Sequence, residues 1–359
     1  MARKAFTEGE PCWVEATVPD EEAARRFYGE LFGWSFAPLS AVGHGSLARL
    51  RGRPVAALTR KPDGRMPTTW NLYLATRDVA DTLERIQRAG GQALGGPTAV
   101  GDFGLRAPAA DPGGAVFTLW QPGVHAGFGT TEEPGAYLWA EVHTRKPARV
   151  DAFYTAVFGY GLTTPTRPGV DGAEPPAVVD EEGDTLAGSG DAERAAPYLF
   201  GLWTPEGAPL DPEYAVLGRC VMGPEEPAPL PPYLLTYFEV EDCAATARRV
   251  VELGGRVRFG PESTPFGELA VVADDQGAVF AVMSGTADPG EGAGSGAAEG
   301  EGEGSGDRES ADGVDRGESA EDLGEAEGAG ATEGAGALVE PGAEDGWEGG
   351  ERGEKGNGS

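Results

Sequence analysis

The feature of this sequence that most constrains its fold is an internal repeat. Residues 12–34, CWVEATVPDEEAARRFYGELFGW, return as residues 138–160, LWAEVHTRKPARVDAFYTAVFGY, at an offset of 126 residues. A Trp, a Glu, a Phe-Tyr pair and a Phe-Gly pair keep the same positions in both copies. A shared offset over so many informative residues predicts a fold built from two related halves.

Each copy of the repeat predicts a strand followed by an amphipathic helix. Over residues 12–18, Trp, Glu and Thr alternate with Cys, Val and Ala, which is the period of a half-buried strand. Asp20 is a suitable N-cap, apolar residues then recur at helical spacing, and Gly33 predicts a left-handed C-cap. In the second copy Pro147 stands where a first-turn proline is tolerated. The unit is the start of a βα module.

The same strand and helix pattern begins again at Trp70 and at Tyr233, so the chain contains four such units. Residues 10–122 are expected to form one domain of two βαβββ modules, and residues 137–285 a second. Residues 123–136 are the linker between them. The predicted fold class is therefore α+β, with two tandem domains.

The second half is longer than the first. Phe117 of the closing strand recurs as Phe280, an offset of 163 that exceeds the first offset by 37 residues. We therefore expect an insertion at about 165–212, rich in Pro, Gly and acids, as a long surface excursion. Two segments, 177–187 and 213–223, compete for the displaced hairpin. The second, EYAVLGRCVMG, better resembles the strand-turn-strand of the first half.

The composition changes sharply after residue 285. Residues 286–359 are mainly Gly, Glu, Ala, Ser and Asp, and they are expected to form a disordered acidic tail because they cannot bury enough apolar surface. The acidic charge of this tail, which contributes to the net charge of −31, speaks against nucleic-acid and anionic-membrane partners. The three cysteines show no CxxC spacing, and no run reaches transmembrane length, so we expect a cytoplasmic protein.

These motifs together resemble a known superfamily. The segments FYGELFGW and FYTAVFGY, with the later ADPGGAVFTLWQ and ADDQGAVFAV, look like the vicinal oxygen chelate superfamily. That superfamily includes glyoxalase I, bleomycin-resistance proteins and extradiol dioxygenases, and the tandem arrangement resembles actinobacterial two-domain glyoxalase/bleomycin-resistance-like proteins. The resemblance implies that the paired modules form a cup-shaped sheet around a cleft. Because the tandem copy supplies this pairing within one chain, we expect a monomer.

The resemblance also implies where metal ligands would stand. Metal-dependent members place ligands on the first and last strands of each module. Carried over to this sequence, those positions fall on Trp13, Trp139, Asn71, Leu235, Thr118 and Ala281. None of these is a good ligand for a divalent cation, so we predict no metal site and no cofactor. A divalent metal held by Glu15, Glu141 or His143 in an unfamiliar geometry stays open.

Strand alternation instead collects aromatic and acidic side chains on one face of each sheet. The first cup is expected to hold Trp13, Glu15, Asn71, Tyr73, Thr118 and Trp120, and the second Trp139, Glu141, His143, Tyr237 and Glu239. Trp and Tyr offer rigid apolar area, and a carboxylate orients or attracts a cationic group, which suits an aromatic or basic small molecule. The alternative for each is structural: a core Trp, an ion-paired Glu or a satisfied His.

Three functions follow from these residues. The favoured one is a metal-independent small-molecule-binding protein of the glyoxalase/bleomycin-resistance type. The second is a lyase, isomerase or dioxygenase-like enzyme in which Glu15 or Glu141 serves as general base or unusual metal ligand, with His143 assisting proton transfer. The third is an interaction scaffold that acts through the acidic tail.

Overall fold

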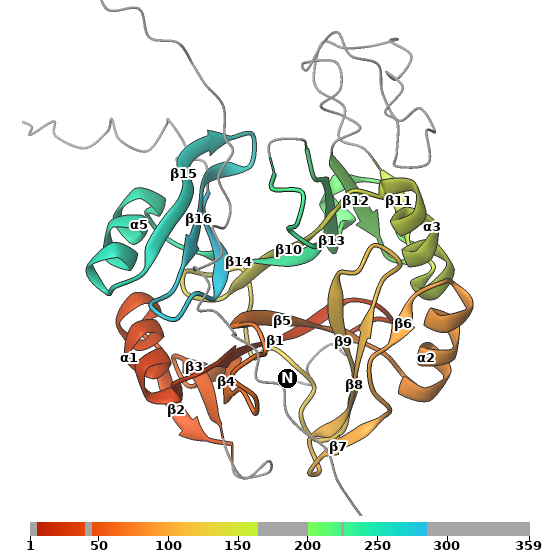
Figure 1. Ribbon diagram of the computed structural model, residues 1–359, viewed down its shortest axis with the longest axis horizontal. Helices are drawn as coiled ribbons and strands as arrows, with labels where there is room; N and C mark the ends of the chain where they lie inside the picture. Colours follow the sequence, from red (N-terminus) through yellow and green to blue (C-terminus); the bar gives the residue numbers. More distant parts are fainter. Residues whose placement is uncertain (1–5, 40–44, 164–199, 224–225, 286–359) are drawn as a thin grey trace, which may run out of the picture.

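Two mixed β-sheets, one from each half of the chain, form the framework of this protein (Figure 1). The structure is a computed structural model that describes residues 6–39, 45–163, 200–223 and 226–285. The first sheet takes its strands from residues 11–122 and the second from residues 137–284. The predicted α+β fold class is confirmed. The predicted acidic tail and the alternative hairpin at 177–187 lie outside the described residues.

The first sheet consists of two βαβββ modules that meet along their first strands. The first module contains β1 (Pro11–Val18), α1 (Glu21–Phe32), β2 (Ser35–Pro38), β3 (Ser46–Leu50) and β4 (Arg53–Arg60). The second contains β5 (Thr69–Ala75), α2 (Val79–Arg88), β6 (Gln92–Ala93), β7 (Thr98–Val100), β8 (Gly104–Ala110) and β9 (Val116–Pro122). The strand order is β2-β3-β4-β1-β5-β9-β8-β6, with β7 paired to β8.

The second sheet repeats this plan. Its first module contains β10 (Tyr137–Thr144), α3 (Pro147–Phe158), β11 (Gly161–Thr163), β12 (Phe200–Thr204), the 3-10 turn η2 (Pro212–Tyr214) and β13 (Leu217–Val221). Its second contains β14 (Tyr233–Glu239), α5 (Cys243–Glu252), β15 (Arg256–Thr264), β16 (Gly267–Ala273) and β17 (Val279–Ser284). The order β11-β12-β13-β10-β14-β17-β16-β15 matches that of the first sheet.

The displaced hairpin differs from the prediction. Of the two candidate segments for it, residues 213–223 resemble a strand-turn-strand more, but they supply only β13 and part of η2. Its partner is β12, which pairs with β13 in antiparallel register and lies inside the segment expected to be a surface excursion. That expectation is wrong for residues 200–204, because Trp203 of β12 has no exposed area and packs 4.5 Å from Tyr154 between ring centroids.

The local signals at the helix ends are confirmed. Asp20 accepts hydrogen bonds from the backbone N–H groups of Glu22 and Ala23, which begins α1. Gly33 has a φ of 69°, the left-handed conformation that ends a helix. Gly159 ends α3 in the same way, with a φ of 71°. These caps direct the chain from each helix back toward its sheet.

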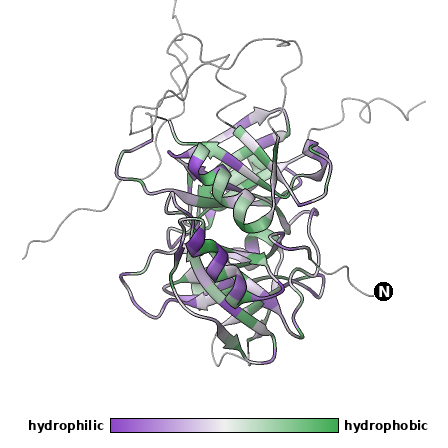
Figure 2. Cartoon of the chain, turned by 90° about the vertical axis from the view of Figure 1, so that its right-hand side faces the viewer, coloured by the Kyte–Doolittle hydropathy of each residue, from purple (hydrophilic) through white to green (hydrophobic). Residues whose placement is uncertain are grey.

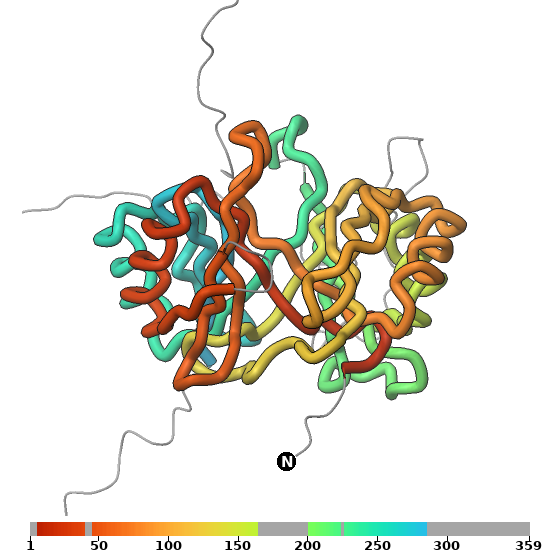
Figure 3. The backbone as a smooth tube through the Cα atoms, turned by 90° about the horizontal axis from the view of Figure 1, so that it is seen from below, coloured from red at the N-terminus to blue at the C-terminus, as the bar shows by residue number. Residues whose placement is uncertain are grey.

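The two halves share one hydrophobic core. Helix α1 lies beside α5, and α2 lies beside α3, so each helix pair joins the two halves (Figures 1 and 3). Between them, Phe238 of β14 packs against Phe32 of α1 and Trp70 of β5, with ring centroids 5.2 and 5.0 Å apart. Figure 2 shows the halves stacked one above the other. Among the described helices, none is both long and apolar enough to cross a membrane.

Candidate functional site

The first sheet curls around a cavity of about 800 Å³, which is the first cup. All six residues predicted for this cup line it: Trp13, Glu15, Asn71, Tyr73, Thr118 and Trp120. The alternation of β1 explains the placement, because Cys12, Val14, Ala16 and Val18 point to the opposite side and have no exposed area. The binding role of the six residues stays a prediction.

Glu15 is the centre of the polar part of the first cup. The Tyr73 hydroxyl donates to its Oε2 at 2.7 Å, and the Thr59 hydroxyl donates to its Oε1 at 2.7 Å. Nη1 of Arg106 lies 3.5 Å from the same Oε2 and donates to the Tyr73 hydroxyl at 3.2 Å. Both carboxylate oxygens therefore accept hydrogen bonds, and the guanidinium balances the carboxylate charge.

The pKa shifts of Tyr73 and Arg106 keep both side chains in the protonated forms that donate hydrogen bonds. Burial raises the pKa of Tyr73 well above its ordinary value, and the Glu15 charge raises it further. Burial alone would lower the pKa of Arg106, but Tyr73 and Glu15 together raise it. The phenol is thus a neutral donor and the guanidinium a cation. The Arg106 side chain is 42% exposed, so its remaining N–H groups are accessible to a ligand.

Aromatic rings form one wall of the first cup. The rings of Trp13 and His125 meet edge to face with centroids 4.6 Å apart, and Phe103 lies 5.8 Å from the same imidazole. Trp120 donates its indole N–H to the His125 carbonyl at 3.0 Å, and Tyr73 lies 6.0 Å from Trp120. The rings hold one another in fixed positions, which gives the cavity a rigid apolar side.

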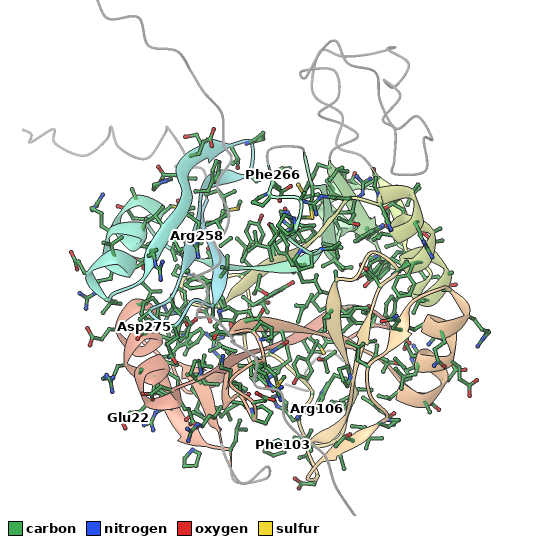
Figure 4. All side chains as sticks on the ribbon, viewed as in Figure 1. Glu22, Phe103, Arg106, Arg258, Phe266 and Asp275 are labelled. Atoms are coloured by element: carbon green, nitrogen blue, oxygen red, sulfur yellow. The ribbon has the colours of Figure 1, made fainter. Side chains whose placement is uncertain are left out.

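The sequence interpretation missed several residues of this cup. Arg106 could have been found, because in β8 it alternates onto the face of Pro108 and opposite Trp120 in β9. Thr59 stands opposite Thr17 in the parallel pair of β1 and β4, a register that no local pattern reveals. His125 comes from the segment expected to be a linker. Figure 4 shows Arg106 and Phe103 on the open side of the first sheet, between β4 and β8.

Asn71 and Thr118, the remaining predicted residues of the first cup, are polar parts of its floor. The Asn71 amide donates to the Thr17 hydroxyl at 2.8 Å and to the Glu15 carbonyl at 3.2 Å. Thr118 pairs in register with Tyr73 and is mostly buried. The amide of Asn71 is thus used to hold β1 and β5 together, which fixes the position of Glu15 above it.

The second cup brings together Trp139, Glu141, His143 and Tyr237. The Tyr237 hydroxyl donates to Glu141 Oε2 at 2.7 Å, and His143 Nε2 lies 3.5 Å from that oxygen. The imidazole stacks on the ring of Tyr233, with centroids 4.5 Å apart and planes within 10°. Burial raises the pKa of Tyr237 well above its ordinary value, and the Glu141 charge adds to the shift. Tyr237 is thus a neutral donor as well.

Among the described contacts, Glu239 makes no hydrogen bond or ion pair with these four residues. It is the last residue of β14, and its backbone pairs with the segment between the two sheets, since Gly135 donates to its carbonyl at 2.8 Å. Burial raises the pKa of its carboxyl, and the charges of Glu132 and Glu133 raise it further. Its charged neighbours are thus in the connecting segment, away from Glu141. Its place in the second cup stays a prediction.

The residues at the implied metal positions do not fit a divalent cation. The indoles of Trp13 and Trp139 have no lone pair available to coordinate a metal, and Leu235 and Ala281 are apolar. Glu15 uses both of its oxygens for Thr59, Tyr73 and Arg106. In the part of the chain that the structure describes, no three His, Cys, Asp or Glu side chains lie close enough to hold a metal ion.

The sequence of this chain is similar to a known family model and to named bacterial proteins. Residues 13–120 match the family model described as a glyoxalase-like domain. A putative glyoxylase, CFP32, of Mycobacterium tuberculosis is 33% identical over 289 residues, which cover 78% of this chain and 97% of the relative. The anthracycline biosynthesis protein DnrV of Streptomyces peucetius is 33% identical over 294 residues, covering 77% of this chain and 94% of the relative.

Among solved structures, the fold is similar to that of the 2,3-dioxygenase LapB from Pseudomonas sp. KL28. The TM-score is 0.53 at 14% sequence identity, and the match covers 80% of this chain and 96% of that chain. At this identity the similarity concerns the fold alone. It agrees with the resemblance found in the sequence, and the sequence relatives confirm that resemblance.

Proposed function

Because this chain belongs to the glyoxalase-like family of the vicinal oxygen chelate superfamily, we propose that it binds a small molecule in its first cup. The ligand class that fits is an aromatic compound bearing hydrogen-bond acceptors. The observation that carries the proposal is the pairing of a rigid aromatic wall with the accessible guanidinium of Arg106 in one cavity. A volume of about 800 Å³ is within the usual range for small-molecule sites.

The charged side chains of the first cup favour one of the two ligand classes, aromatic or basic, that the sequence left open. Arg106 balances Glu15, so the carboxylate has little attraction left for a basic group. Arg60 also lines the cavity and adds a second positive charge. A carbonyl, phenolate or carboxylate oxygen is therefore a better partner for this cup than an amine, because it accepts the spare N–H groups of Arg106.

The name of one relative supports an aromatic ligand. This relative is named for anthracycline biosynthesis, and anthracyclines are polycyclic aromatic ketones. Binding without a divalent metal is part of the proposal, because the implied ligand positions hold Trp13, Asn71 and Thr118. Nothing in this cup requires a cation to orient an aromatic oxygen, since Arg106 already supplies the positive charge.

The two other functions have less support. A general base needs a lone pair directed at its substrate, and three of the roughly four lone-pair positions of Glu15 accept hydrogen bonds from Thr59, Tyr73 and Arg106. The scaffold function depends on residues 286–359, which lie outside the described residues. The monomeric state and the cytoplasmic location stay predictions.

The test uses anthraquinone carboxylate as probe and the full chain, by calorimetric titration with and without a chelator. We expect saturable binding that the chelator leaves unchanged and that Arg106→Leu weakens about tenfold or more. Arg249→Leu is the matched control, because it removes one arginine charge from the surface of α5. An Arg106→Leu variant that binds the probe as tightly as Arg249→Leu would contradict the proposal.

A further inference from the structure

The two cups share a frame but differ at the central carboxylate. In each, a Trp and a Glu stand two residues apart on the first strand, and a Tyr on the neighbouring strand donates to the Glu at 2.7 Å. The registers agree as well, since Tyr73 stands opposite Trp13 and Tyr237 stands opposite Trp139. Differences between the cups can therefore be compared position by position.

The groups that satisfy Glu15 have been replaced around Glu141. Arg106 pairs in register with Trp120, and Leu269 takes its place opposite Met283. Thr59 stands opposite Thr17, and Cys220 takes its place opposite His143. Within the described residues, Glu141 thus has a phenol and an imidazole beside it, but no arginine or lysine partner.

The surroundings of Glu141 are apolar and aromatic. Its side chain is only 12% exposed. A Cβ at Gly218 would meet Glu141 Cγ at 2.8 Å and the Trp139 indole nitrogen at 3.0 Å. Because glycine has no Cβ, the Glu141 side chain and the Trp139 indole can pack closely against the backbone at this position. Leu235, Val271 and Ala281 complete an apolar cluster with Tyr237. A carboxylate held here without a cation is costly, which favours a ligand that supplies positive charge.

We propose that the second cup binds a small organic amine with an apolar body. The ammonium group would lie against Glu141, and the faces of Trp139 and Tyr237 would add cation–π attraction. His143 Nε2 is buried without a hydrogen-bond partner among the described residues, and it offers a second acceptor for an ammonium N–H when the imidazole is neutral. This inference does not depend on the function proposed for the first cup.

The alternative is an internal pair in which His143 becomes protonated and neutralises Glu141 by itself. The two atoms lie 3.5 Å apart but form no hydrogen bond, whereas Arg106 Nη1 does donate to Glu15 Oε2 at the same distance. An amine can approach the carboxylate more closely than this imidazole does. If the pair is internal, the second cup has no need of a cationic ligand and no amine will bind there.

The experiment titrates phenethylamine into the full chain, with phenylethanol as the neutral analogue of the same shape. We expect saturable amine binding, and at least about tenfold weaker binding of the alcohol. Glu141→Gln should weaken amine binding about ten- to a hundredfold. Glu22→Gln is the matched control and should leave amine affinity unchanged, because it removes one carboxylate from the exposed surface of α1.

A second variant tests the same idea by gain of charge. Leu269→Arg places in the second cup the arginine that the first cup has, so it should abolish amine binding while Glu141 remains. Circular dichroism of both variants checks that the fold is kept. The inference is overturned by amine affinity that survives Glu141→Gln, by equal losses in Glu22→Gln and Glu141→Gln, or by no saturable amine binding at all.

Discussion

The hydroxyl of Tyr28 donates a hydrogen bond of 2.8 Å to Oδ2 of Asp274, which joins α1 of the first half to the turn before β17 of the second. The related pair on the other side of the molecule makes no such bond. The Tyr154 hydroxyl and Asp111 Oδ2 are both buried without a hydrogen-bond partner among the described residues. The repeat thus provides the same residues at both junctions, but only one junction is closed by a hydrogen bond.

We predict that Tyr28→Phe destabilises the full chain by about 2 kcal/mol. The change keeps the ring but leaves Asp274 Oδ2 without its donor and the Trp70 indole N–H without its acceptor, and unpaired buried polar groups are costly. Urea unfolding followed by tryptophan fluorescence measures the difference.

Tyr154→Phe is the control for this prediction. It makes the same chemical change at the other junction, where the hydroxyl has no partner among the described residues. We expect its free energy of unfolding to equal or exceed that of the unmodified chain, because an unsatisfied hydroxyl leaves the interior. Equal losses in the two variants would show that the Tyr28 hydrogen bond contributes nothing specific.

Asp111 gives the protein a pH-dependent stability. Burial raises the pKa of its carboxyl from the ordinary 3.8 to about 6, although three backbone N–H groups that donate to Oδ1 lower it. The folded state therefore holds a proton that the unfolded state releases between these two values. This contribution to stability is complete below about pH 4 and is lost as the pH rises through 6, up to about 3 kcal/mol.

Asp111→Asn tests this pH dependence, because the amide keeps an oxygen acceptor for the turn and never ionises. We expect the variant to gain stability relative to the unmodified chain as the pH rises from 4 to 7, by about the same amount. The measurement is urea unfolding of both proteins at several pH values. A difference between the two that does not change with pH would contradict the raised pKa of Asp111.

The elements that the sequence predicts correctly are those set by local chemistry. Asp20 and Gly33 mark the ends of α1 because capping depends on a few neighbouring backbone groups. The strand β12 was missed because its segment lies within an insertion that breaks the repeat. Its identity depends on pairing with β13 and on burial of Trp203, and neither is visible in a window of sequence.

The site residues likewise divide into those that local sequence predicts and those that only the folded structure brings together. The face that carries Trp13 and Glu15 is predictable because strand alternation is a consequence of backbone geometry. The charge balance of Glu15 is not, because Arg106 is 91 residues away in sequence and reaches it only through the register of four strands. A carboxylate that the sequence offers as a base or an attractor of cations is thus an ion-paired group in the fold.

The direction in which Glu15→Gln changes ligand affinity separates acceptor-bearing ligands from basic ligands for the first cup. Glu15→Gln removes the charge that balances Arg106, so we predict that anthraquinone carboxylate binds a few-fold more tightly. A basic ligand would instead bind more weakly to this variant. Calorimetric titration measures the change, and Glu141→Gln should leave the affinity for this probe unaltered. Weaker binding in Glu15→Gln would contradict an acceptor-bearing ligand.

The purified full chain is predicted to carry much less than one transition-metal ion per molecule, even after incubation with Fe(II), Mn(II), Ni(II) or Zn(II). The reason lies in the donor set: Trp13 and Trp139 stand at implied ligand positions, and the oxygens of Glu15 are taken by Thr59, Tyr73 and Arg106. Elemental analysis after desalting measures the content. Near-stoichiometric metal that disappears in Glu15→Gln would mean that this carboxylate gives up its ion pair for a cation, and the first cup would then be a metal site.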